Sequence, residues 1–184
     1  MDVLGLLRIA RGLNGGADLA GNAIGAPTSF AIACAANPAA PDLEVEFSKL
    51  RAKIEAGATF AQTQPVYDIG ALESFLAREE ARAIPLLVGL IPLRSLKQTL
   101  FFANEVPGIV VPEEIQKRMR AAADRGAEHE KAEGLAIARE LAAAIAGLAR
   151  GIHIMPMGKY ALVKEILEAV PQRSKRPRET AGGR

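Results

Sequence analysis

The sequence predicts an α/β protein built on a parallel sheet. Four short apolar segments, residues 28–36, 58–64, 84–92 and 151–156, alternate with segments whose apolar residues recur at helical spacing. The four segments are apolar throughout, which is typical of strands covered by helices on both faces of a sheet. This pattern leaves two architectures open: a doubly wound open sheet, and part of a (β/α)8 barrel, of which four units are half.

Helical segments surround these strands. The first helix is expected over residues 3–13, before the helix-stopping Asn14-Gly15-Gly16 run. Asp42 and Asp68 stand at the N-cap positions of the next two. The predicted helices after the first cover residues 42–56, 69–83 and 94–106, a segment that begins at Pro112, and residues 127–149 and 159–170.

Charge and domain size limit the classes of function. The chain has 184 residues, 49% of them hydrophobic, so one folded domain over residues 1–170 is expected. The 23 basic and 21 acidic residues nearly balance, and several basic ones crowd into the end of the chain. The body therefore lacks the basic excess of a nucleic-acid-binding surface. Residues 171–184 read as a basic disordered tail.

The cysteine content and the hydropathy of the sequence indicate the cellular compartment in which the protein is expected. Cys34 is the only cysteine, which excludes an internal disulfide and a CxxC pair. No apolar run approaches the roughly 20 residues that a membrane-spanning helix needs, and the amino terminus has no signal-peptide pattern. We expect a soluble, cytoplasmic protein with no membrane partner.

The carboxyl ends of the predicted strands carry polar residues. In parallel α/β folds these ends hold ligands. Gln62 and Gln64 share one face of their strand, because side chains alternate along a strand. Each amide can donate and accept a hydrogen bond, so it could bind a ligand edge that does both, or a neighbouring loop backbone. His153 is expected in the core and His129 on the surface, which leaves no metal site.

Several stretches resemble one family. KIEAGATFAQTQPVYD, residues 53–68, is similar to the segment of methylenetetrahydrofolate reductases in which a lysine, an AGA turn and a strand ending in Thr-Gln precede an aromatic residue and Asp. TSFAIACAANP before it and VGLIPLRSLKQTLFFANEVPGIVVPEEI after it resemble the flanking family segments in the same order. Residues 5–30 most resemble the form fused behind a homocysteine methyltransferase. The resemblance implies the last four units of a (β/α)8 barrel and the preceding helix.

The resemblance also implies roles for particular residues. Those matching family positions for substrate binding are Gln64, Gln98, Phe102 and Lys159, and those matching positions for flavin binding are Lys53, Glu46, Ala35 and Asn37.

Some of these positions depart from the family pattern. Asn37 replaces a tyrosine of some members, and Glu46 stands where Asp is frequent. Lys159 stands where Arg is frequent, which keeps the charge and loses the bidentate fork. Lys49 departs from a flavin-binding asparagine.

The activity implied is FAD-dependent reduction of 5,10-methylenetetrahydrofolate to 5-methyltetrahydrofolate, with NADH or NADPH as reductant. The family's acid lies on the first strand of the barrel, so the catalytic residue is not among these 184 residues. The expected partners are a folate and either the amino-terminal barrel half or further copies of this chain. The alternative is a non-catalytic half-barrel that binds folate or flavin and self-associates through open sheet edges.

Overall fold

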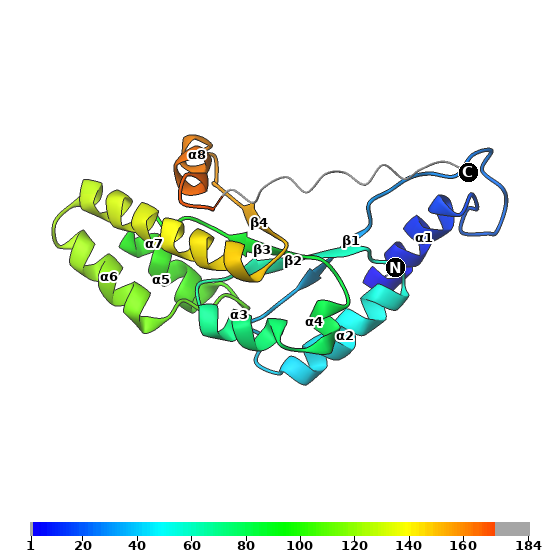
Figure 1. Ribbon diagram of the computed structural model, residues 1–184, viewed down its shortest axis with the longest axis horizontal. Helices are drawn as coiled ribbons and strands as arrows, with labels where there is room; N and C mark the ends of the chain where they lie inside the picture. The colour runs from blue at the N-terminus through cyan, green and yellow to red at the C-terminus, as the bar shows by residue number, and fades with distance from the viewer. Residues whose placement is uncertain (1, 172–184) are drawn as a thin grey trace.

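The protein contains one four-stranded parallel sheet. The computed structural model describes residues 2–171, so nearly all of the predicted tail lies outside the described residues. The strands pair in the order of the sequence: β1 (Ala33–Ala36), β2 (Phe60–Pro65), β3 (Leu86–Leu90) and β4 (Gly151–Ile154) (Figure 1). Such an order has no reversal of the kind that marks a doubly wound sheet. It is the order of successive strands in a (β/α)8 barrel.

Helices follow each strand, as predicted. Asp2, Asp42, Asp68 and Ser95 each accept a hydrogen bond from a backbone N–H in the first turn of a helix, which satisfies one of its free donors. The helices are α1 (Val3–Asn14), α2 (Leu43–Glu55), α3 (Ile69–Leu76), α4 (Glu79–Arg82), α5 (Leu96–Glu105), α6 (Glu113–Ala123), α7 (Ala127–Leu148) and α8 (Ala161–Leu167).

Several predicted elements are shorter in the structure, and contacts explain the difference for two of them. The strand predicted over residues 28–36 begins only at Ala33. Ahead of it, the side chain of Asn14 at the end of α1 binds both backbone groups of Phe30, with Nδ2 to O at 2.9 Å and N to Oδ1 at 2.8 Å. The Asn14 side chain therefore holds the backbone at Phe30, and pairing with the start of β2 begins only at Ile32, whose carbonyl accepts the Thr59 N–H at 2.7 Å.

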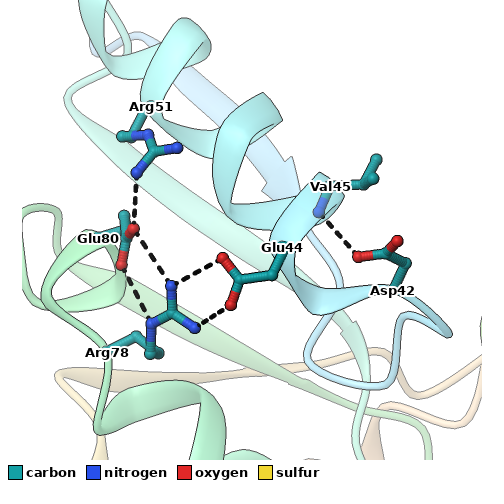
Figure 2. Close-up of polar contacts among 6 residues, drawn as sticks. All are labelled: Asp42, Glu44, Val45, Arg51, Arg78 and Glu80. Carbon is teal, nitrogen blue, oxygen red and sulfur yellow. Dashed lines mark hydrogen bonds and ion pairs between the residues drawn. The ribbon is translucent and has the colours of Figure 1, made fainter.

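The helix predicted over residues 69–83 is broken into α3 and α4. Arg78, between them, has an extended backbone (φ −78°, ψ 145°). Its guanidinium forms a bidentate pair with Glu44 of α2 and a further pair with Glu80 (Figure 2). It also lies 4.5 Å from the centre of the Phe47 ring. The interactions with α2 come from a side chain that leaves the helical path, which accounts for the break.

The hydrophobic core has two parts. One joins β1, β2 and the helices α1 and α2, where Phe47 and Phe75 stack with ring centres 4.8 Å apart. The other joins β3 to α5, α6 and α7. Along β2, Ala61 and Thr63 are buried, whereas Gln62 and Gln64 are not. The alternation confirms that the two glutamines share one face, and that this face is the less covered one.

The structure tests the predictions for three single residues. Cys34 is buried and is not in a disulfide, and His129 is exposed, as predicted. His153 was expected in the core, but it lies only half-buried in β4, because it stands on the less covered face of the sheet beside Gln62. Over the described residues, no helix is both long enough and apolar enough to cross a bilayer.

Candidate functional site

Polar side chains meet at the carboxyl edge of the sheet. The segments that leave the four strands begin with Asn37 after β1, Val66 after β2, Ile91 after β3 and Met155 after β4. All four strands are parallel, so their carboxyl ends lie along one edge. The predicted substrate and cofactor residues are distributed over the ends of these strands and over two of the helices that follow them.

The four residues matched to flavin binding form two hydrogen-bonded pairs at the end of β1. The Lys53 ammonium donates to the Ala35 carbonyl oxygen at 2.7 Å. The backbone N–H of Asn37 donates to Glu46 Oε1 at 3.0 Å. Both acidic and basic partners come from α2, which therefore fixes the turn after β1. Glu46 is 9% exposed, and the Asn37 side chain accepts from Ala39 N–H, so neither is free to reorient.

A bulge at the end of β2 presents Gln64. The pairing register of β2 with β3 shifts between Gln62 and Pro65. There the Thr63 hydroxyl donates to the Gln64 carbonyl at 2.7 Å and accepts from Gly89 N–H at 2.9 Å, which replaces a backbone bond of the ladder. Gln64 is exposed, and among residues 2–171 its amide has no side-chain partner. Both its donor and its acceptor are available to a ligand.

Gln62, one layer deeper, is engaged by β4. Its Nε2 lies 3.4 Å from His153 Nδ1, across the intervening strand β3. The pair leaves Gln62 less accessible to a ligand than Gln64.

The loop after β3 is held from two sides. Gln98 on α5 accepts the Arg94 N–H at 2.9 Å, and Glu130 on α7 accepts the Leu96 N–H at 2.6 Å. Gly134 of α7 lies against the same loop, where a Cβ would come within 1.9 Å of the Leu93 carbonyl oxygen. Because the oxygen of Gln98 is already used, this side chain has its amide hydrogens left for a ligand.

Two aromatic residues stand side by side on α5. Phe102, matched to substrate packing, is 7% exposed and belongs to the core around β3. Phe101 is 52% exposed, and the two ring centres are 6.0 Å apart. Little of the Phe102 ring can meet a ligand in this arrangement, and its role stays a prediction.

The turn after β4 carries Lys159. Met157 has a φ of 48° and Gly158 a φ of 81°, and Lys159 N–H closes the turn on the Pro156 carbonyl at 2.9 Å. A left-handed conformation is uncommon for methionine and marks a tightly determined turn. Lys159 itself is exposed. Gln64, Gln98 and Lys159 share no hydrogen bond with one another within residues 2–171, so the structure places them on one edge without joining them.

The sequence analysis assigns no role to three residues that shape this edge: Thr63, Arg94 and Gly134. The roles of Thr63 and Gly134 depend on contacts with segments distant in sequence. The contact of Arg94 with Gln98 spans only four residues. In the described part of the chain, no cluster of three or more His, Cys, Asp or Glu side chains could hold a metal ion.

Comparison with known proteins adds two findings. Residues 25–171 match the family model described as methylenetetrahydrofolate reductase. A solved structure, an uncharacterized protein from Clostridium thermocellum that binds two copies of 5-methyl-5,6,7,8-tetrahydrofolic acid, is similar with a TM-score of 0.52 and 20% identity. The match covers 74% of this chain and 51% of that one, so this chain spans about half its length. No curated protein matches the sequence.

Proposed function

Because this chain belongs to the methylenetetrahydrofolate reductase family, we propose that it carries the folate-binding strand ends and part of the flavin site of such a reductase. The reaction is the reduction of 5,10-methylenetetrahydrofolate to 5-methyltetrahydrofolate, with FAD as cofactor and NADH or NADPH as reductant. The observation that carries the proposal is the sheet edge itself, where the Gln64 amide and the Gln98 amide hydrogens have no partner among residues 2–171.

Folate binding rests on complementary hydrogen bonding. A pterin presents donors and acceptors side by side, and Gln64 can satisfy both with one exposed amide. The Gln98 oxygen already accepts the Arg94 N–H, whereas its amide hydrogens have no partner among the described residues. We therefore assign Gln64 to a ligand edge that both donates and accepts, and the Gln98 amide hydrogens to a ligand acceptor. Lys159 adds a positive charge on the same edge.

The residues at the end of β1 fit a flavin. Ala33 and Ala35 are exposed on the less covered face of the sheet, so their small side chains leave space for a flat ring. Lys53 places a cation beside them, and Glu46 fixes the turn. FAD, when bound, would supply the transfer of hydride. Lys53 would orient and neutralise its polar edge, and the backbone of Asn37 is held so that the ring is not obstructed.

A complete site needs further strands. In the family that this chain resembles, the acid that protonates folate belongs to an earlier strand of the barrel. We propose that those strands pair with the exposed edge of β1, whether they belong to the same polypeptide or to another. The likeness of residues 5–30 to the form fused behind a homocysteine methyltransferase supports such a two-domain enzyme. The coding sequence upstream of Met1 tests this.

Binding of 5-methyltetrahydrofolate to the full chain, measured by calorimetry, is the direct test. Gln64→Ala should weaken binding about tenfold, because a ligand group loses its partner. Gln116→Ala is the matched control, since Gln116 lies on α6 and its Nε2 binds the Val111 carbonyl. No binding by the unaltered chain, or equal binding by the Gln64 variant, contradicts the folate proposal. Joining the chain to an upstream barrel half should then give FAD binding and folate-dependent NADH oxidation.

A second candidate is a non-catalytic half-barrel that self-associates. The observation in its favour is that β1 and β4 each pair on one side only within the described residues. Exposed parallel edges invite association. Sedimentation velocity separates the candidates: a dimer that binds folate supports the second, and a monomer counts against it.

A further inference from the structure

A pocket lies beside the predicted folate-binding residues and is lined in part by one of them, Lys159. It has a volume of about 680 Å³ and is formed by the loop after β3, by α7, and by the turn and first residues of α8. Three cations line it, one from each of these elements: Arg94, Lys131 and Lys159. Of the described residues that line the pocket, none is acidic. Leu135 and Leu162 complete an apolar wall.

Arg94 is the unusual member of this set. Its Nε is shielded from solvent and has no hydrogen-bond acceptor within residues 2–171. A shielded N–H in a native fold normally has a partner. The backbone of Arg94 is fixed by Gln98, and the loop before it rests on Gly134. The backbone that carries this side chain is therefore held in place, and its shielded Nε lacks an acceptor among the described residues.

The surrounding charges do not cancel this cation. Lys131 forms an exposed ion pair with Glu128 at 2.6 Å, and Lys159 has no ion pair in the part of the chain described. Glu130 on α7 accepts the Leu96 N–H at 2.6 Å and does not line the pocket. The charged residues that line the pocket are all cations, and neither Arg94 nor Lys159 has an ion pair among residues 2–171.

We propose that this pocket binds an oxyanion, a carboxylate or phosphate group held by Arg94 with Lys159 and Lys131 around it. The planar guanidinium presents parallel N–H donors that match two oxygens of either group. Such an anion has two possible sources: a free oxyanion, or the carboxylate end of a bound folate. The first is independent of the proposed function, and the second rests on it.

Titration with inorganic phosphate tests the site itself. The full chain is expected to bind phosphate, and Arg94→Gln to weaken that binding at least tenfold. Arg120→Gln, an equal loss of charge at an exposed position on α6, should change it less than twofold. Arg94→Lys keeps the positive charge but loses the parallel N–H donors of the guanidinium, so its phosphate affinity should lie between those of the other two variants. Thermal unfolding of each variant verifies folding, and the lysine variant serves if the glutamine variant does not fold.

A folate and a pterin that lacks its carboxylate end distinguish the two possible sources of the oxyanion. If the ligand is the carboxylate end, Arg94→Gln weakens binding of 5-methyltetrahydrofolate tenfold and leaves 6-methyltetrahydropterin, which has no carboxylate, unchanged. If phosphate binding responds and neither pterin binds, the oxyanion site stands and the folate proposal fails. The site is overturned if Arg94→Gln affects phosphate and folate no more than Arg120→Gln does.

Discussion

At this edge of the sheet, single residues determine which side-chain donors and acceptors remain available to a ligand. Gln64 is presented because Thr63 takes over the backbone bonds beside it, and the Gln98 oxygen is already engaged by the Arg94 N–H. The sequence predicts that Gln62 and Gln64 share one face, since alternation is a local rule. It does not predict that the Gln62 amide is engaged, because its partner lies 91 residues away.

Gly134→Ala should destabilise the fold by about 2 kcal/mol or more, since the new Cβ must displace either α7 or the Leu93 carbonyl. Gly147 in the same helix has open space around it. Its replacement by alanine should stabilise the protein, by up to about 1 kcal/mol. Urea unfolding of both variants measures the difference. Equal effects at the two positions would contradict the close approach of α7 to the loop.

The Cys34 thiol should react slowly in the native protein. Burial raises its pKa, so little thiolate is present near neutral pH, and the side chain is 7% exposed. Labelling by a thiol reagent at pH 8 should be at least about 100-fold slower than in denaturant. A native rate close to the denatured rate would show that β1 opens readily.

At the scale of elements, the type and order of the units were predictable, and their ends were less so. Apolar periodicity and the caps Asp42 and Asp68 indicated the helices correctly. The break at Arg78 was not predictable, because residues 71–83 contain no Gly or Pro to mark it. The ion pairs with Glu44 and Glu80 and the contact with Phe47 are tertiary, and they outweigh local propensity.

The ion pair between Glu44 of α2 and Arg78, which precedes α4, should make the free energy of unfolding depend on pH. The hydrogen bond from Arg78 holds the pKa of Glu44 below its usual range. A lowered folded-state pKa gives a stabilisation that is present above the unfolded pKa, about 4.3, and is lost as pH falls through the folded value. Glu44→Gln should therefore flatten the decline in urea midpoint between about pH 5 and pH 3.

Glu105→Gln, at an exposed position without an ion pair in the described chain, should keep the slope of the unaltered protein. Both Glu44 and Arg78 are substantially exposed, so the difference should shrink in high salt. A Glu44 variant with the original slope in low salt would rule out this ion pair as its source.

Across the whole molecule, the central strands of the sheet are paired more fully than the strands at its edges. β2 and β3 have a strand on each side, whereas β1 and β4 have one. All four residues of β4 are only half-buried. Sequence alone left the architecture open between two folds, since both use alternating apolar strands and helices. The order of the strands, a long-range property, favours the barrel arrangement.

Hydrogen exchange should follow that gradient. Amides of β2 and β3 are expected to exchange slowest, because opening them breaks two ladders and both parts of the core. β4 amides should exchange first among the strands. Addition of an upstream barrel half should slow exchange in β1 more than in β3. Mass spectrometry of peptic fragments resolves these strands, and uniform protection across the sheet would contradict the gradient.

Thr63 and Gly89 form a unit whose members cannot change independently. The Gly89 N–H depends on the Thr63 hydroxyl, and a Cβ on Gly89 would lie 2.6 Å from the Thr63 carbonyl oxygen. Loss of the hydroxyl leaves a buried donor unpaired, and loss of the glycine closes the space that the bulge needs. Related sequences should therefore show covariation between these positions: a residue other than Thr or Ser at the first should accompany a rearranged strand end, and with it a displaced Gln64.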